Sequence, residues 1–494
     1  MDTQLMSQLH VWDKVDDLEV IPGDKIEPAM SRTTREVPCL LKPATRETLI
    51  EVVSIARERK IRIYPVSLGK NWGYGAHLPV ENDCVIVSLE KWKKIGPCDP
   101  QSGKIYIEPG VSQIELYNYL EENHPEFTFN VTGAGSDTSI IGNTLERGIG
   151  YYRSRANELH GLEVLTIDGE IIKQDPRLWH PSHPEGIGTG WEGLFFQSNF
   201  GIVLGGWFTL LPKQESTTFI SIRNFDLDTL LDDFKALYRE RILDEIVHIA
   251  DPGRKIYVMK GLILKTQPNI SEEQVEEVLE QFGSKKNFQG LTAIHGRKAV
   301  VKAAAKEIKK IISPSSTLDA FTPEKVKRVA GLTRKIPIRK IQNVGIFMES
   351  IQEILLLSNG NPTNIGHLSI TMEGDNPNYA DELAVYLNAT LPPRENATSE
   401  LRAMLEDKGY KYSITYIVNK DQAVSAIITL HFEVGESEKV QEALRTLTVA
   451  LIEHGFPPYR AGIDQMKYLG MPDITRKLKD YFDPQHLIAP GRYT

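Results

Sequence analysis

The stretch "PVSLGKNWGYG", from Pro65 to Gly75, follows the apolar run "IRIY" and holds three glycines, a serine, a lysine and an asparagine. A β-branched apolar run that ends at glycine is typical of a strand that enters a turn. Such a turn can bring backbone N–H groups close to a phosphate. The stretch alone is a weak signal, because most glycine turns after strands are only turns. It matches neither G-x-x-x-x-G-K-S/T nor G-x-G-x-x-G, which disfavours a nucleoside triphosphatase and a Rossmann domain.

A second glycine-rich loop lies further along the chain. The segment Val131–Tyr152, "VTGAGSDTSIIGNTLERGIGYY", carries five glycines among small polar residues. Bare backbone and small hydrogen-bond donors suit a pyrophosphate. Two such loops in one domain indicate a dinucleotide ligand.

The segments around these loops alternate between strand and helix patterns up to about residue 212, which predicts an α+β domain. Apolar residues at helical spacing predict helices over residues 47–60, 112–125, 228–242, 271–286 and 436–455. Strands are expected over residues 61–69, 255–265, 410–420 and 422–434. The later region is therefore expected to be a sheet with helices packed against it.

Five stretches in this order resemble the vanillyl-alcohol oxidase and p-cresol methylhydroxylase family of flavoproteins. They are "PVSLGKNWGYG", "YIEPGVSQIELYNYLEE", "SIIGNTLERGIGYY", "GLFFQSNFGIVLGGWFTLLP" and the C-terminal "YRAGIDQM" with "FDPQHLIAPGRY". The resemblance covers residues from about 33 to 212 and from 380 to 494, and it is weak over residues 215–375.

The resemblance implies an α+β fold in which a two-subdomain FAD-binding domain of the PCMH type is joined to a cap domain. The cap, which binds substrate in relatives, would hold an antiparallel sheet flanked by helices. We expect an N-terminal segment over residues 1–32, the FAD-binding domain over 33–214, the cap over 215–455, and a C-terminal segment over 456–494 that returns to the FAD site.

The same resemblance implies FAD as the cofactor and assigns residues to it. The expected FAD-binding residues are Pro65, Ser67, Leu68, Gly69, Lys70, Asn71, Pro109, Gly110, Gly133, Ser136, Thr138, Ser139, Gly142, Asn143, Gly161, Glu163, Gly201, Ile202, Val203 and Arg492. Arg492 matches a cation beside the flavin, where a positive charge would stabilise the anionic reduced form. The alternative for Arg492 is an exposed arginine in a helix-ending turn.

Three further matches point to a phenol. The residues Tyr74, Tyr459 and Arg460 occupy positions that bind the oxygen of a para-substituted phenol in relatives. Holding a phenol with a pKa near 10 in its ionised form at neutral pH requires about 4 kcal/mol. One guanidinium and two hydroxyl donors in a water-poor pocket could supply it. Taken singly, each residue is better explained by packing or by an exposed surface position, but the joint match to three family positions reverses this preference.

Ionising the phenol pushes electron density towards the para substituent and makes hydride departure from the benzylic carbon feasible. The resemblance implies that FAD accepts this hydride and that the product is a p-quinone methide. Water then adds, or a neighbouring proton is lost to give an alkene. The protein would act chiefly by electrostatic stabilisation.

The chain departs from the family where relatives attach FAD covalently. A histidine position of relatives aligns with Ser425 or Ala426, and the position used by bicovalent relatives is Asn71. None of these side chains can attack the flavin. Non-covalent FAD is therefore expected, with His431 and Tyr416 as the remaining candidates for a link.

A second departure concerns the base. The oxidase carries an aspartate where this chain has Ala134, and Asp137 lies three residues later. Asp137 either replaces that carboxylate from a shifted loop or caps the loop through an Asx hydrogen bond. Tyr151 matches a pocket tyrosine of relatives and is equally explained as a packed aromatic residue.

The composition of the chain limits which partners and which cellular compartment are expected. The net charge of −9 is spread along the 494 residues, so nucleic acid and anionic membranes are unexpected partners. Cys39, Cys84 and Cys98 lack metal-ligand spacing and indicate free thiols in a reducing compartment, so no metal is expected. The N-terminus lacks the pattern of a signal peptide, and no apolar run is long enough for a membrane span. A cytoplasmic protein is expected.

These observations predict an FAD-dependent oxidoreductase acting on a 4-hydroxybenzylic alcohol or a 4-alkylphenol, with dioxygen or an electron-transfer protein as acceptor. Dimerisation is common in the family, so a homodimer is a further expectation. Two alternatives stay open: oxidation of a non-phenolic alcohol, because Arg460 could also pair with a carboxylate, and a non-redox cyclisation or elimination on a flavin scaffold.

Overall fold

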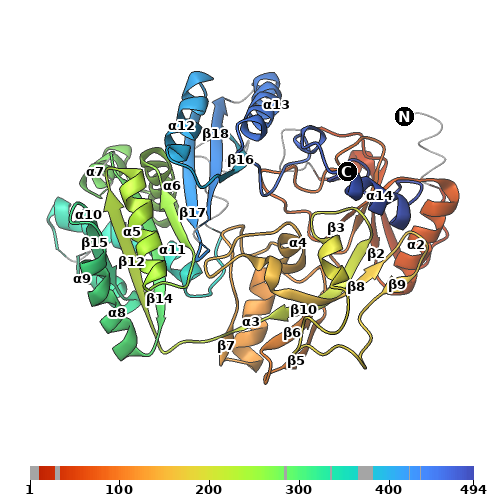
Figure 1. Cartoon of the computed structure of the whole chain (residues 1–494), viewed down its shortest axis with the longest axis horizontal. Helices are drawn as coiled ribbons and strands as arrows, with labels where there is room; N and C mark the ends of the chain where they lie inside the picture. Colours follow the sequence, from red (N-terminus) through yellow and green to blue (C-terminus); the bar gives the residue numbers. More distant parts are fainter. Residues whose placement is uncertain are drawn as a thin grey trace.

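The computed structural model of the chain describes residues 10–27, 34–282, 286–333, 336–364, 382–421, 423–433 and 436–494. Within this part of the chain, two smaller sheets form one half of the molecule and a seven-stranded sheet forms the other (Figure 1). The α+β fold is therefore confirmed. None of the helices in these residues has the length and apolar character needed to cross a membrane.

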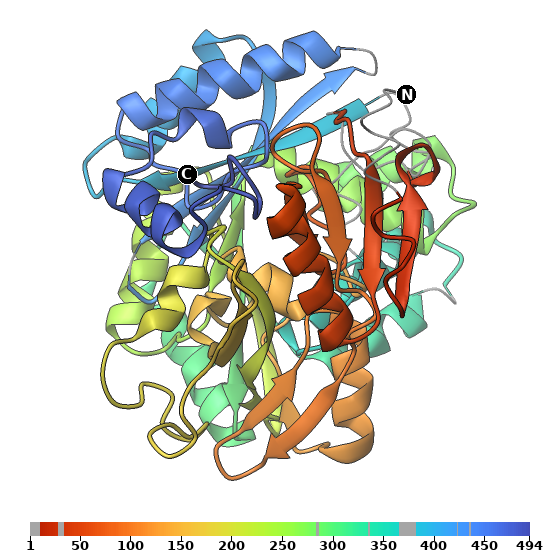
Figure 2. The same cartoon turned by 90° about the vertical axis from the view of Figure 1, so that its right-hand side faces the viewer.

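The first sheet has the strand order β1-β2-β4-β3 and carries the opening stretch at its edge. Its strands are β1 (Leu18–Pro22), β2 (Cys39–Pro43), β3 (Ile63–Val66) and β4 (Val85–Ser88). β1 pairs antiparallel with β2, so part of the segment 1–32 belongs to this sheet. Helix α2 (Arg46–Arg59) covers it in Figure 2 and begins at Thr45, whose hydroxyl accepts the N–H of Thr48.

The second sheet has the order β5-β6-β10-β8-β9 and is antiparallel. Its strands are β5 (Ile95–Asp99), β6 (Lys104–Ile107), β8 (Leu159–Leu165), β9 (Ile171–Ile172) and β10 (Ile202–Thr209). Helix α3 (Gln113–Asn123) starts with a capping box of Ser112 and Glu115. The short helix α4 (Ile140–Leu145) follows the second glycine loop, and β7 (Phe127–Thr128) pairs with β11 (Leu211–Pro212). Short 3-10 helices lie at Gly23–Lys25, Arg155–Asn157, Trp191–Phe195 and Met466–Tyr468.

The seven-stranded sheet has the order β15-β12-β14-β13-β17-β18-β16, and every neighbouring pair is antiparallel. Its strands are β12 (Ser216–Asn224), β13 (Val247–Ala250), β14 (Phe288–Gly296), β15 (Thr317–Phe321), β16 (Glu382–Leu391), β17 (Lys411–Val418) and β18 (Val424–Glu433). The chain enters this sheet directly after β11.

Helices cover both faces of the seven-stranded sheet, as Figure 1 shows. The helices α5 (Leu227–Arg239), α8 (Lys298–Ile311), α12 (Ala397–Asp407) and α13 (Ser437–Glu453) bury one face in the largest apolar core. On the other side lie α6 (Pro252–Thr266), α7 (Glu272–Phe282), α9 (Pro323–Thr333), α10 (Arg339–Ser350) and α11 (Gln352–Ser358). Because side chains alternate along a strand, the residues between the core positions face this second side.

The prediction of a strand over residues 255–265 is wrong, because these residues belong to helix α6. The helix begins at Asp251, whose carboxylate accepts the N–H of Arg254, and Pro252 occupies its first position. Aspartate followed by proline is a strong signal for a helix start. The apolar run over residues 255–265, which contains β-branched residues, also fits a strand, and the strand prediction is based on this run alone.

The C-terminal segment returns to the first sheet. Ile63 donates its N–H to Leu487 O at 2.8 Å, and Ala489 donates to Ile63 O at 2.7 Å. In helix α14 (Asp473–Phe482), the fully buried Lys479 donates to Asn199 O, Ile488 O and the Asp483 carboxylate at 2.6–2.7 Å. These bonds hold the end of the chain, including Arg492, beside the glycine loops.

Candidate active site

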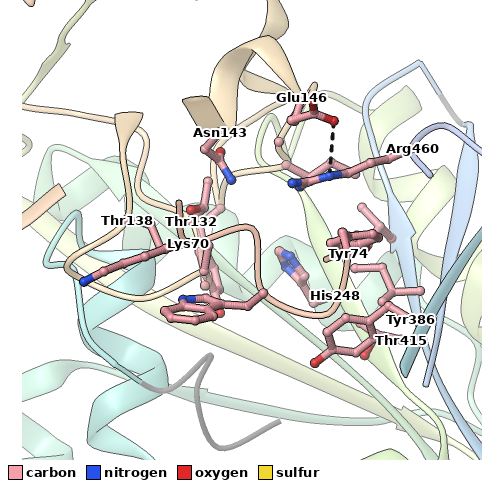
Figure 3. Close-up of a pocket in the computed structure, with 18 of the residues that line it drawn as sticks. Lys70, Tyr74, Thr132, Thr138, Asn143, Glu146, His248, Tyr386, Thr415 and Arg460 are labelled. Atoms are coloured by element: carbon pink, nitrogen blue, oxygen red, sulfur yellow. Dashed lines mark ion pairs between the residues drawn. The ribbon is translucent and has the colours of Figure 1, made fainter. Parts of the chain in front are cut away.

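A cavity of about 880 Å³ lies between the two smaller sheets and the seven-stranded sheet. Its cofactor side comes from residues before Pro212 and from the C-terminal segment after Phe456. Its cap side comes from the seven-stranded sheet and from helices on its second face. Figure 3 shows how side chains from both sides point into this space.

The loop after β3 forms one wall of the cofactor side. Gly69 has a φ of +64°, and a Cβ atom there would lie 2.8 Å from the Cβ of His77. The backbone of Ser67–Asn71 donates no hydrogen bond to the rest of the described chain. Donors without a protein acceptor, in a loop that lines a cavity, are available to an anion.

The second glycine loop, together with the first turn of α4 into which it runs, forms the opposite wall and approaches the first loop closely. A Cβ at Gly142 would lie 2.3 Å from Ser67 Oγ, so only glycine allows this approach. Ser139 donates to Pro109 O at 2.7 Å, and Gln113 donates to Gly135 O at 2.8 Å. Two glycine loops that converge on one cavity, the first of them with open backbone donors, fit the pyrophosphate of FAD.

A buried arginine that the sequence analysis missed holds this loop. Arg155 is fully buried and donates to Gln113 Oε1 and to Asn130 O, both at 2.6 Å. Burial lowers the pKa of Arg155 to about 10, so it stays charged at neutral pH. Gln113, which accepts from Arg155, donates in turn to Gly135 O. Arg155 therefore supports the shape of the glycine loop.

Most of the predicted FAD-binding residues line this cavity. They are Pro65, Ser67, Gly69, Lys70, Asn71, Pro109, Gly133, Thr138, Ser139, Gly142, Asn143, Gly201, Ile202, Val203 and Arg492. Leu68, Gly110, Ser136, Gly161 and Glu163 are not among the lining residues. The Glu163 carboxylate pairs with Arg46 at 2.5 Å, and a Cβ at Gly110 would meet three backbone carbonyls within 2.9 Å. These two residues therefore contribute to packing beside the cavity.

Two predicted cations share one carboxylate that the sequence analysis missed. Glu146 forms ion pairs with Arg492 and, through Oε2 at 3.7 Å, with Nε of Arg460. Tyr493 donates its hydroxyl to the same carboxylate at 3.1 Å. All three charged side chains are less than one-fifth exposed. Two guanidinium groups against one carboxylate leave a net positive charge, and Figure 3 shows the pair of Glu146 and Arg460.

The three residues expected at a phenol oxygen lie together. The Arg460 guanidinium carbon stands 4.3 Å from the ring centroid of Tyr74, and its Nη2 donates to Asn71 Oδ1. Asn388 on β16 donates to the Tyr74 hydroxyl at 3.0 Å. Burial raises the pKa of Tyr74 and raises that of Tyr459 well above its usual value. Both hydroxyl groups therefore keep their protons at neutral pH and can donate them in hydrogen bonds.

The cap side adds side chains that the sequence analysis did not identify. The ring of His248 on β13 lies 4.7 Å from the ring of Tyr151, and Tyr386 on β16 lies 5.8 Å from Tyr74. Burial raises the pKa of Tyr151 to about 12 and lowers that of His248 to about 4. Both groups are therefore neutral at pH 7. Figure 3 shows His248, Tyr386 and Thr415 below the level of Arg460.

The residues considered for a base and for a covalent link lie elsewhere. Asp137 forms an ion pair with Lys70 and is not among the lining residues, whereas Ala134 is. His431 bonds to Ser413 at 3.0 Å and packs edge-on against Tyr257. Tyr416 is fully buried in the core on the opposite face of the sheet.

Comparison with known proteins agrees with the cofactor side of this cavity. Residues 37–175 match the model of a family described as an FAD binding domain. A curated relative, the 4-cresol dehydrogenase [hydroxylating] flavoprotein subunit of Pseudomonas putida, is 30% identical over 203 residues. That match covers 40% of this chain and 39% of the relative.

Two longer matches extend over the cap. The 1'-carboxy-chondrochloren decarboxylase of Chondromyces crocatus is 24% identical over 94% of this chain and 92% of its own length. The crystal structure of p-cresol methylhydroxylase with substrate bound superposes with a TM-score of 0.80 at 19% identity, over 100% of this chain and 97% of that one. The resemblance expected from the sequence is thus confirmed: the chain carries an FAD-binding domain of the PCMH type and shares the fold of p-cresol methylhydroxylase.

Proposed function

We propose that this chain is an FAD-dependent oxidoreductase that removes a hydride from the benzylic carbon of a para-substituted phenol. The observation that carries the proposal is the position of Arg460 against the ring of Tyr74, inside a cavity that the FAD loops also line. Tyr459, the residue before Arg460, supplies a second hydroxyl donor beside that of Tyr74, so the site holds one cation and two hydroxyl donors.

The role of these residues is to hold the phenol oxygen as an anion. Arg460 shares the carboxylate of Glu146 with Arg492, so its charge is only partly neutralised. Burial raises the pKa of Tyr74 and of Tyr459, so both hydroxyl groups stay protonated and can donate hydrogen bonds to a phenol that is bound as its anion. A charge-assisted hydrogen bond from each donor then stabilises the phenolate.

FAD, when bound, supplies the hydride acceptor. The loops Ser67–Asn71 and Gly133–Asn143 would hold its pyrophosphate, and Arg492 would place a positive charge close to the ring system. We propose that the cofactor is not covalently linked, because Ser425 cannot form such a bond and Tyr416 faces the core. His431 is engaged by Ser413 and Tyr257.

The electron acceptor in this proposal is dioxygen or an electron-transfer protein. The name of the Pseudomonas relative, a dehydrogenase flavoprotein subunit, supports a protein acceptor.

A second candidate function is the decarboxylation of a carboxylated aromatic substrate. It is favoured by the relative of that activity, which matches 94% of this chain, and by a second cation, Arg254, in the same cavity. The two functions share the cofactor side and the phenol contacts, and they differ in the group that leaves the substrate.

The test is anaerobic mixing of the FAD-loaded protein with 4-hydroxybenzyl alcohol and 4-ethylphenol, followed through the flavin absorbance. We expect bleaching with wild type and a fall of about a hundredfold in its rate for Arg460→Gln, as for loss of one electrostatic donor. The exposed Arg445→Gln serves as the matched control and should react as wild type does. A panel of phenols that leaves the flavin oxidised, or an Arg460→Gln protein that reacts undiminished, contradicts the proposal.

A further inference from the structure

The cavity extends across the whole seven-stranded sheet. Every strand contributes to its lining, from Tyr386 on β16 at one edge to Asp319 on β15 at the other. Strand β13, with His248, lies three strands from β16, or roughly 14 Å at ordinary strand spacing. The phenol contacts lie at the β16 end, so the cavity has room for a substrate that continues well beyond a benzylic carbon.

The lining of the cavity favours anionic groups. Among the described residues that line it, seven are lysine or arginine and three are aspartate or glutamate. Lys70 pairs with Asp137, which lies outside the lining, so the excess is three positive charges, although the whole chain carries a net charge of −9. A lining of this charge suits a ligand with an anionic group, and the partners of each cation show which one could meet that group.

Arg254 is the cation best placed to meet that group. It stands in the first turn of α6, four residues after the end of β13, and it lines the cavity. Its Nη1 is buried and has no hydrogen-bond partner among the described residues. Its guanidinium carbon lies 5.9 Å from the ring centroid of Tyr257. A buried guanidinium N–H without an acceptor is costly, unless a ligand supplies the acceptor.

The neighbouring charges do not satisfy Arg254. The carboxylate of Asp251 accepts backbone N–H groups from Arg254 at 2.6 Å and from Ile414 at 2.9 Å. Asp319, at the far edge of the sheet, pairs with Arg223 at 2.6 Å. Lys255 points to Asn287, to whose backbone carbonyl it donates at 3.2 Å. Nη1 of Arg254 is thus left without an acceptor among the described residues, in a side chain that lines the cavity.

We propose that the substrate carries a carboxylate beyond its para substituent, and that Arg254 binds this carboxylate while Arg460 binds the phenol oxygen at the other end. The planar guanidinium matches the geometry of a carboxylate with two parallel hydrogen bonds. The inference rests on the proposed function, because it takes the phenol site as the second point of attachment. It narrows the substrate class from phenols in general to phenols with a carboxylate-bearing side chain.

The test compares a series of ω-(4-hydroxyphenyl)alkanoates of increasing chain length with their primary amides, which have the same shape and no charge. Binding is followed by the change in flavin absorbance of the FAD-loaded protein. Wild type should bind one or more of the acids at least about tenfold more tightly than the matching amide, the usual effect of a charged hydrogen bond. Arg254→Gln should bring this ratio close to one by weakening the binding of the acid more than that of the amide.

Two further variants and the FAD content of Arg254→Gln separate the outcomes. Arg254→Lys should keep part of the preference for the acid, and the exposed Arg239→Gln on helix α5, on the opposite face of the sheet, should keep all of it. Arg254→Gln should retain FAD as wild type does, since a loss of FAD would assign Arg254 to the cofactor and overturn the inference. Equal binding of acids and amides by wild type, or an acid preference that survives in Arg254→Gln, also overturns it.

Failure of the proposed function has a different signature. If Arg460→Gln weakens both acids and amides but no acid preference exists, the phenol site stands and only the carboxylate site falls. If neither series perturbs the flavin and Arg460→Gln has no effect, the phenol site falls and the carboxylate site falls with it.

Discussion

The two sides of the cavity are built in different ways. The cofactor side offers backbone N–H groups from two glycine loops, each only a few residues long. The cap side offers side chains from seven strands and from helices spread over residues 221–427. A cofactor that does not vary can be bound by local loops, whereas substrate contacts can change one strand at a time without disturbing those loops. This comparison makes different predictions for variants on each side.

The largest effect is expected for a side chain at the meeting point of the glycine loops. A Cβ at Gly142 would lie 2.3 Å from Ser67 Oγ and 3.3 Å from Ser67 Cβ, so Gly142→Val should push the loops apart. We expect a purified protein that retains no FAD, measured as the ratio of absorbance at 450 nm to that at 280 nm. Gly193→Val is the control, because nothing lies within 4 Å of a Cβ there. A yellow Gly142→Val protein would contradict the assignment of these loops to FAD.

The next effect concerns the C-terminal segment, which joins the cofactor side from far away in the sequence. Lys479 and Asp483 form a fully buried pair at 2.6 Å, so Lys479→Met leaves a buried carboxylate without its cation. A loss of about 3–5 kcal/mol in the free energy of unfolding is expected. Denaturant unfolding of the FAD-loaded protein measures it, and the exposed Lys477→Met on the same helix is the control. Equal stability of the two variants would show that the segment is held by other contacts.

The same contrast explains what could be predicted from sequence. The loops around Gly69 and Gly142 carry their signal locally, as glycines among small polar residues, so a dinucleotide ligand could be predicted from them. FAD and most of the lining residues followed from the resemblance of five stretches to a flavoprotein family. His248, Arg254 and Asn388 gave no local signal, because they reach the cavity through the pairing of distant strands and helices. Glu146 lies within the second glycine-rich segment, but its partners Arg460 and Arg492 come from the C-terminal segment, so the ion pairs could not be read locally. The start of α6 did have a signal, Asp251 before Pro252, which the apolar run after it concealed.

A smaller effect is expected on the cap side, in the dependence of stability on pH. Burial lowers the pKa of His248 to about 4, below the usual 6.5, so the unfolded chain takes up a proton that the folded chain does not. Stability should therefore fall as the pH drops from 6.5 to 4, by on the order of 2 kcal/mol for this residue.

His248→Phe should remove that part of the loss. Unfolding in denaturant at pH 7 and pH 4.5, followed by circular dichroism, measures the difference for wild type and variant. His454→Phe, at an exposed position, provides the comparison. If His248→Phe loses as much stability on acidification as wild type does, the ring of His248 is not held neutral by its surroundings.

The smallest effect, on the ionisation of a bound phenol, is expected from the loss of the Tyr459 hydroxyl, which lies where the two sides of the cavity meet. Tyr459→Phe removes one donor to the bound phenol oxygen but keeps Arg460 and Tyr74, so about 1.4 kcal/mol, or tenfold, should be lost. The apparent pKa of a bound phenol such as 4-hydroxybenzaldehyde should rise accordingly, which its own absorbance reports. The exposed Tyr481→Phe should leave this value unchanged. A Tyr459→Phe protein that ionises the phenol as readily as wild type does would contradict this prediction. The charge of Arg460, and not the hydroxyl of Tyr459, would then set the protonation state of the phenol. The phenol site would depend on the C-terminal segment through Arg460 alone.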